Sequence, residues 1–356
     1  MKLEKTGLFR GWSASFRFGV AVLFAVAGLA VCAGTKTWNP TVSSGGNYKW
    51  SEAANWLEGG AATTAPANGD SLEFNSSSAA ITAVNDCSGL QVAGIAFSGS
   101  NAITLSGNKI DIAADGVLSA ANAPITVTLA LPMDLAGMTV LSSVKGDAAS
   151  GTTFELTGVI GGAGGLATGG DWSGTYNFRA ANTYAGMTYL TNGLTYNVHN
   201  GAAFGSSATK TYYRVLDNIG GTSNFDRYVS TIYFHGVTTD EPFDVWGNQM
   251  RSLVFMANTT NILNGAIYSL DTGNVERWTV QNNALAVCNG PVDLTSTVQL
   301  NVNAGGELVF ANTFTFTRTS TSTIRNSSAS GGTIRYTGDI RCEVAPRSTC
   351  MAPARS

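Results

Sequence analysis

Short runs in which apolar and polar residues alternate extend through most of the chain. Thr153–Leu156, Thr175–Phe178 and Thr313–Phe316 each place an apolar side chain at every second position. Such alternation is typical of strands with one buried face. Gly, Asn, Asp or Ser residues separate one run from the next, and beyond residue 33 no stretch keeps the apolar spacing of an amphipathic helix. The pattern predicts an all-β chain of many short strands, arranged as a sandwich, a barrel or a solenoid.

Internal repetition distinguishes between these architectures. A strand followed by Gly-x-Ile occurs at 154–160, 262–267 and 334–340, and the middle copy is one residue shorter. A second phrase, Asn-Gly or Ala-Gly before a strand, also recurs. Repetition of a hairpin-sized phrase at irregular intervals suits a solenoid, because its turns accept insertions as loops. We therefore predict a right-handed parallel β-helix over 76–340.

One stretch carries a denser pattern than the rest. It reads Gly-Val-Ile-Gly-Gly-Ala-Gly-Gly-Leu from Gly158, Asn-Thr-Tyr-Ala-Gly-Met-Thr from Asn182 and Asn-Gly-Leu from Asn192. These phrases resemble the autotransporter-associated β-strand repeat of exported bacterial proteins. The positions that carry the resemblance are Gly158, Gly161, Gly164, Gly165, Asn182, Thr183, Tyr184, Gly186, Asn192 and Gly193. The resemblance implies a passenger-type β-helix, exported to or beyond the surface of a bacterium with an outer membrane, and it implies no enzymatic activity.

These residue types suit the turns and the interior of a solenoid. Gly158 and the glycine-rich run 161–165 permit turns with positive φ. Asn182 and Asn192 suit left-handed corners, and stacked Asn side chains can hydrogen-bond from one turn of the solenoid to the next. Tyr184 is expected to fill the interior.

The first 33 residues predict a secretory signal peptide with cleavage after Ala33. The apolar run Phe18–Cys32 is shorter than the roughly 20 residues that a helix needs to cross a bilayer, and small residues follow it. Two alternatives stay open, an uncleaved membrane anchor and a lipoprotein acylated at Cys32. Four basic residues precede the run, namely Lys2, Lys5, Arg10 and Arg17.

The segment 34–75 is rich in tryptophan. Trp38, Trp50 and Trp56 precede the phrase Gly69–Phe74. A solenoid must cover its first turn, and tryptophan side chains bury a large area. We therefore predict a cap, and a sugar-stacking face is the alternative interpretation.

Composition and charge exclude one class of partner. Only 12% of the residues are charged and 42 are Gly. Without the predicted leader, which holds four of the 20 basic and one of the 23 acidic residues, the formal charge is −6. Nucleic-acid binding requires a basic surface that neutralises phosphates, and the sequence has no such stripe. We predict no nucleic-acid partner.

The segment 341–356 differs from the strands before it. Alternation stops, and Arg, Pro and Cys occur together, which predicts an irregular tail that is truncated or frame-shifted. Cys342 and Cys350 are close enough in sequence to pair, and export permits disulfides. Cys87 and Cys288 are expected to be buried small hydrophobes.

The sequence offers little that predicts catalysis or a bound metal. His199 and His235 are the only histidines, so acid–base chemistry would fall on carboxylates. The densest acidic phrase is Asp240–Asp244. A Ca²⁺ site there with Arg251 as a base is conceivable, but a solvated turn is the simpler interpretation. Because no motif holds a phosphate, metal or nucleophile, we predict no catalytic residue, no metal and no cofactor.

The range 200–250 is the least repeat-like part of the chain and is expected to be an insertion. Loops on a rigid scaffold are where binding residues gather. The candidate ligand-binding residues are Tyr212, Tyr213, Tyr228, Trp246 and Arg251.

The sequence therefore predicts a secreted or outer-membrane-associated, non-catalytic β-helical repeat protein with a structural or adhesive role. Surface glycans or other cell-surface proteins are the expected partners. The alternatives are a carbohydrate-active β-helix enzyme, either a polysaccharide lyase or a glycosidase, and a carbohydrate-binding protein built on the tryptophan-rich segment.

Overall fold

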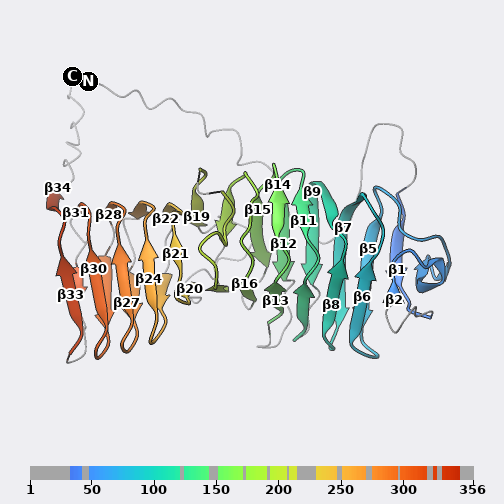
Figure 1. Cartoon of the computed structure of the whole chain (residues 1–356), viewed down its shortest axis with the longest axis horizontal. Coiled ribbons are helices and arrows are strands. Elements are labelled where there is room, and N and C mark those ends of the chain that lie inside the picture. The colour runs from blue at the N-terminus through green and yellow to red at the C-terminus, as the bar shows by residue number, and fades with distance from the viewer. Residues whose placement is uncertain are drawn as a thin grey trace, which may run out of the picture.

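The structure is a computed structural model that forms one long stack of strands (Figure 1). The predicted leader, except Ala33, and the tail after Val344 lie outside the described residues. The structure describes residues 33–41, 48–120, 124–143, 151–170, 174–190, 193–206, 208–214, 230–246, 251–269, 275–295, 297–318, 324–326 and 331–344.

The described strands form three sheets of 17, 12 and 5 strands, here called sheets A, B and C. Sheet A contains β1 (Thr35–Trp38), β3 (Trp56–Glu58), β4 (Ala61–Ala62), β5 (Ser71–Ser76), β7 (Leu90–Gly99), β9 (Ile110–Ala120), β11 (Met133–Leu135), β12 (Thr139–Ser143), β14 (Ile160–Gly162), β15 (Leu166–Gly170), β17 (Thr188–Leu190), β19 (Thr211–Arg214), β22 (Phe243–Trp246), β25 (Ile267–Ser269), β28 (Val292–Leu294), β31 (Phe314–Arg318) and β34 (Ile340–Val344).

Sheet B contains β2 (Tyr48–Lys49), β6 (Ile81–Asn85), β8 (Ile103–Gly107), β10 (Thr126–Leu129), β13 (Thr153–Leu156), β16 (Thr175–Phe178), β18 (Thr195–Val198), β20 (Ser230–Phe234), β23 (Arg251–Phe255), β26 (Val275–Val280), β29 (Thr297–Val302) and β32 (Ile324–Asn326). Sheet C contains β21 (Thr238–Thr239), β24 (Thr260–Leu263), β27 (Leu285–Cys288), β30 (Glu307–Phe310) and β33 (Thr333–Tyr336). A short 3₁₀ helix, η1 (Ala53–Asn55), lies near the start.

Each turn of the solenoid is called a rung, and the first described strand of sheet C is β21, so rungs with one strand in each of the three sheets occur in the C-terminal half. In the C-terminal half a rung runs from sheet B through sheet C to sheet A, as in β26, β27 and β28. Strands of successive rungs pair in parallel; β26, for example, pairs with β23 and β29. Antiparallel pairs among the described strands occur only at the start, between β1, β3 and β4. This arrangement confirms the predicted all-β, parallel β-helix.

The interior is built from columns of apolar side chains, because alternate residues of every strand point inward. In sheet B one column joins Phe154 to Tyr176 and Tyr176 to Tyr196, with ring centroids 5.3 and 5.6 Å apart. The tyrosine hydroxyls reach across to sheet A. Tyr176 donates to the carbonyl oxygen of Gly169 at 3.0 Å, and Tyr196 pairs with the Thr168 hydroxyl at 2.7 Å. These partners allow tyrosine to serve as a core residue.

The tryptophan-rich segment covers the first rung, as predicted. Trp38, Trp50 and Trp56 are 4%, 0% and 0% exposed. The Trp56 ring packs edge-on against those of Trp38, Trp50 and Phe74, and its indole donates to the carbonyl oxygen of Trp50 at 2.8 Å. Burial of all three indoles argues against the alternative of a sugar-stacking face.

The glycines of the repeat-like stretch were expected to permit turns with positive φ. In the structure most of them instead allow neighbouring rungs to pack closely. In the run 161–165 only Gly162 has positive φ, at +95°. A Cβ on Gly158 would collide with the backbone of Leu131, and one on Gly164 with the backbone of Gly137. Glycine therefore lets neighbouring rungs approach. The same backbone crowding occurs at Gly165 and Gly186, whereas a Cβ on Gly161 would collide with the Asp134 side chain.

The expected left-handed corner at Asn182 is also wrong, because its φ is not positive. Its buried side chain joins rungs instead. The Asn182 Oδ1 accepts from the Ile160 amide at 2.9 Å, and its Nδ2 donates to the Ala203 carbonyl oxygen at 2.6 Å. The Thr183 amide adds a bond to the Ile160 carbonyl oxygen at 2.8 Å. Rung-to-rung hydrogen bonding by Asn is thus present.

The other repeat positions have mixed outcomes. Tyr184 is fully buried, as expected, and its hydroxyl lies 2.6 Å from the Thr188 hydroxyl. Gly193 has positive φ, at +76°. Asn192 lies outside the described residues.

The range 200–250 contributes regular rungs wherever it is described. Strands β19 to β22 pair in register with their neighbours in the three sheets. Residues 207, 215–229 and 247–250 of this range lie outside the described residues.

At the C-terminal end, β34 continues to Val344 and pairs with β31. The last rung thus extends beyond the boundary expected at residue 341. Cys342 is exposed on β34, and its proposed partner Cys350 lies outside the described residues. Cys288 is buried, as expected, whereas Cys87 is half-buried.

Within the ranges given above, no helix is long and apolar enough to span a bilayer.

Candidate functional site

Five outward-facing side chains line up on consecutive strands of sheet A. Each is the second residue of its strand, and the strands pair in register. We call this row the tyrosine ladder. It consists of Tyr189 on β17, Tyr212 on β19, Asp244 on β22, Tyr268 on β25 and Asp293 on β28.

The aromatic members present flat, partly exposed surfaces. The rings of Tyr189 and Tyr212 stack with centroids 5.2 Å apart and planes inclined by 16°. All three tyrosines are half-buried, so one part of each ring is open to solvent. Because neighbouring rungs are about 4.8 Å apart, the ladder repeats at roughly the size of one sugar ring.

Charged groups lie between and beside these rings. The Lys210 Nζ is 3.8 Å from the Asp244 Oδ2 and 4.7 Å from the centroid of the Tyr268 ring. Burial raises the pKa of Asp293, and the nearby Glu343 raises it further. The Asp293 Oδ1 is shielded from solvent and accepts no hydrogen bond from the described part of the chain.

The structure describes the backbone positions of four of the five predicted binding residues. Tyr212 is in the ladder. Tyr213 and Trp246 belong to β19 and β22 of the same sheet, and Arg251 begins β23 in sheet B. The side chains of these three lie outside the described structure, as does all of Tyr228.

Four residues of this surface were not predicted from the sequence. The phrases Thr188-Tyr-Leu and Val292-Asp-Leu each place a ladder residue between two buried residues. Alignment of these phrases would have revealed the row. The residues missed are Tyr189, Lys210, Tyr268 and Asp293.

The acidic phrase Asp240–Asp244 is not the solvated turn that was expected. Asp240 is exposed, but Glu241 is only 3% exposed and points into the interior, where its carboxylate accepts from the Thr211 hydroxyl. Asp244 faces the opposite side of the wall. The two carboxylates therefore cannot act on one ligand. Within the described ranges, no three His, Cys, Asp or Glu side chains are grouped so that they could hold a metal ion.

Glu241 gives the fold a dependence on pH. Burial raises its pKa from 4.5 to about 8, against the opposing effect of the Thr211 hydrogen bonds. The folded state thus binds this proton more tightly than the unfolded state does. The stabilisation is complete below about pH 4.5 and decreases as the pH rises towards about 8.

We expect Glu241→Gln to remove this pH dependence, because the amide is neutral and can still accept from Thr211. At about pH 7.5 the variant should be more stable than the wild type by roughly 1–3 kcal/mol. Urea unfolding at several pH values measures the effect. Asp240→Asn, the exposed neighbour, should leave the pH profile unchanged, and equal profiles for the wild type and the Gln variant would contradict the assignment.

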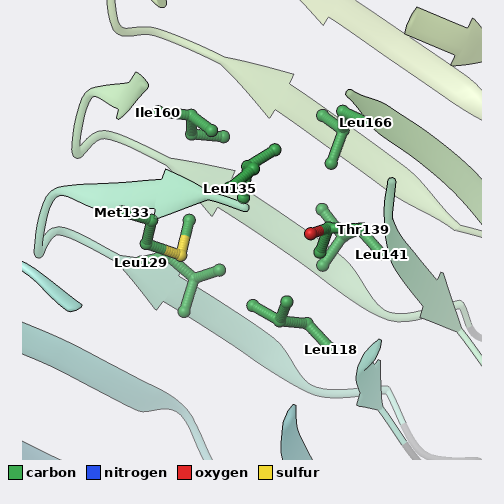
Figure 2. A pocket seen from close by; sticks show the side chains of 8 residues that line it. All are labelled: Leu118, Leu129, Met133, Leu135, Thr139, Leu141, Ile160 and Leu166. Atoms are coloured by element: carbon green, nitrogen blue, oxygen red, sulfur yellow. The ribbon is translucent and has the colours of Figure 1, made fainter. Parts of the chain in front are cut away.

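A small pocket lies inside the solenoid rather than on its surface. Figure 2 shows side chains from β9 to β15 pointing towards one another between the walls. The single polar group among them is the Thr139 hydroxyl, which has no hydrogen-bond partner in the described structure. This pocket is a small packing defect of the core, and apart from the Thr139 hydroxyl its lining is apolar. Its lining residues are Leu118, Leu129, Met133, Leu135, Thr139, Leu141, Ile160 and Leu166.

In comparisons with known proteins, no family, no curated protein and no solved structure matches this chain. The tyrosine ladder is therefore interpreted from its geometry.

Proposed function

We propose that this protein is an exported, non-catalytic β-helical protein that acts as a structural or adhesive passenger at a bacterial cell surface and binds glycans through the tyrosine ladder. The fold supplies a long rigid wall, and the ladder supplies a row of ligand-sized contacts on it. Export and the lack of catalysis rest on the predicted leader and on the resemblance to the passenger repeat.

The observation that carries the proposal is the row of aromatic rings and carboxylates on consecutive rungs, which alternate from Tyr212 to Asp293. The C–H face of a pyranose ring packs on an aromatic ring, while its hydroxyls donate to carboxylates. Tyr212 and Tyr268 provide the rings, and Asp244 lies buried between them. The more exposed Lys210 ammonium group, 3.8 Å from the Asp244 Oδ2, is a donor that a sugar hydroxyl would meet. A linear glycan lying along the row would meet one such group on each rung.

A glycan array with the purified chain tests this proposal. Tyr212→Ala should weaken binding about tenfold, because an aromatic contact contributes on the order of 1 kcal/mol or more. Tyr233→Ala is the matched control, since Tyr233 is a half-buried, outward-facing tyrosine on sheet B and should leave binding unchanged.

Three outcomes would contradict the proposal. Absence of sugar binding would remove the adhesive role, and equal losses in the two variants would show that the ladder is not the site. Release of a shortened or unsaturated sugar would favour the polysaccharide-active enzyme instead.

A further inference from the structure

The two histidines of the chain lie on top of each other. His199 follows β18 and His235 follows β20, and their rings stack with centroids 4.2 Å apart and planes inclined by 22°. The His199 amide donates to the Phe178 carbonyl oxygen, and the His235 amide donates to the Val198 carbonyl oxygen, both at 3.0 Å. The histidines therefore hold the same corner position on successive rungs.

Arg179 holds that corner position one rung earlier, because its amide donates to the Leu156 carbonyl oxygen at 3.1 Å. We call Arg179, His199 and His235 the histidine column. By the same backbone pattern Thr157 precedes the column and Met256 follows it, and neither side chain carries a charge.

A chain of polar contacts on sheet B supports the column. The Arg179 Nε lies 2.7 Å from the Glu155 Oε2, and the Asn177 Nδ2 donates to the Glu155 Oε1 at 2.6 Å. The Asn197 Nδ2 donates to the Asn177 Oδ1 at 2.7 Å, so the Asn197 Oδ1 is left to face the His235 Nε2 at 3.1 Å.

This geometry fixes the tautomer of His235. Because the Asn197 Oδ1 can only accept, the His235 Nε2 carries a proton in the neutral ring. The Nδ1 is therefore the atom that takes up a second proton.

The surroundings keep both rings neutral near pH 7. Burial lowers the pKa of His199, and so do His235 and Arg179, whereas Glu155 raises it. Burial and Arg179 lower the pKa of His235. Tyr233 on β20 lies beside Asn197 in the sheet. Glu155 is the carboxylate that faces the column, and Arg179 already engages it.

We propose that the histidine column is a second ligand site, which binds the carboxylates of an acidic polysaccharide when the surroundings become mildly acidic. Protonation of both rings would give three stacked cations against the single carboxylate of Glu155. A polymer of uronate sugars brings one carboxylate after another to donors about 4.8 Å apart. Arg179 offers the planar donor geometry that suits a carboxylate.

The sign of the pH dependence follows from linkage. A bound carboxylate stabilises the charged imidazoles, so binding takes up protons and strengthens as the pH falls through the histidine pKa values. Sugar carboxylates remain largely ionised at about pH 5, since carboxyl groups titrate near pH 4.

Titration calorimetry with polygalacturonate tests the site, with a neutral glucan as the ligand control. The wild type should bind polygalacturonate at least about tenfold more tightly at about pH 5 than at about pH 7.5, with proton uptake. The double variant His199→Gln/His235→Gln should lose this gain. Tyr212→Ala should keep it, because the tyrosine ladder lies on another sheet. A loss of neutral-glycan binding at the tyrosine ladder can thus be distinguished from a loss of polygalacturonate binding at the histidine column.

A second measurement keeps the proposal falsifiable if the double variant does not fold. Two histidines give two sets of ring signals in NMR spectra, so their titration can be followed in the wild type. Added polygalacturonate should raise both pKa values. Unchanged titration, equal affinities at the two pH values or no binding at about pH 5 would each overturn the proposal.

Discussion

Replacement of Trp56 by alanine is expected to lower the free energy of unfolding by about 3–5 kcal/mol, the usual range for removal of a buried tryptophan. Trp56 is fully buried, and its ring centroid lies 4.8 Å from that of Trp38 and 5.8 Å from that of Phe74. The substitution would leave a cavity above the first rung and remove the hydrogen bond to the Trp50 carbonyl oxygen. Urea unfolding followed by circular dichroism measures the loss.

Trp56→Phe is the matched control for this cavity. The smaller ring keeps much of the contact with Phe74 but loses the indole hydrogen bond, so a loss of about 1–2 kcal/mol is expected. Hydrogen exchange then locates the damage. Since each rung contacts only its neighbours, protection should fall first in β5 and β6 and stay high in β27 and β30. A uniform loss of protection would show that Trp56 does not act as a cap.

Replacement of Gly164 by alanine is expected to destabilise the chain by about 2–3 kcal/mol, which is typical of overpacking. The added Cβ would collide with the carbonyl group of Gly137 on one side, and Gly186 packs against Gly164 on the other. Three consecutive rungs meet at this point, so relief of the clash requires displacement of backbone rather than of a side chain.

Gly169→Ala is the control for the loss of a glycine as such. Its Cβ would lie 3.4 Å from the Val140 side chain and 3.6 Å from that of Ser142, which are ordinary contacts. A change within about 1 kcal/mol is expected. Thermal or urea unfolding compares the two variants, and equal effects would mean that rung spacing at Gly164 is not the constraint.

The sequence predicted the walls of this fold because alternation records which side of a strand is buried. It could not predict the register, because the chain between equivalent positions varies in length. Glu155 and Asn177 occupy matching positions 22 residues apart, whereas Asn177 and Asn197 are 20 residues apart. Because the period of the repeat varies, residues that stack in one column cannot be recognised from their spacing in the sequence.

The candidate site was predicted only in part for the same reason. Tyr212 was selected for its aromatic surroundings, but its partners Tyr189 and Tyr268 were separated from it by chain of different lengths. No sequence pattern connected His199 with His235, although the register makes them neighbours. The Glu241 side chain likewise points into the interior because of where its rung bends. The sequence of the acidic phrase does not indicate the position of that bend.

The parallel pairing of successive rungs also determines how the molecule would respond to force. Hydrogen bonds between paired strands run along the long axis of the stack, from β23 to β26 to β29. Tension applied between the two ends would load these interfaces in series, as it loads the coils of a spring, so the weakest interface sets the force at which the stack yields. A tether built this way would lengthen in steps, one rung at a time, while the remaining rungs keep their shape.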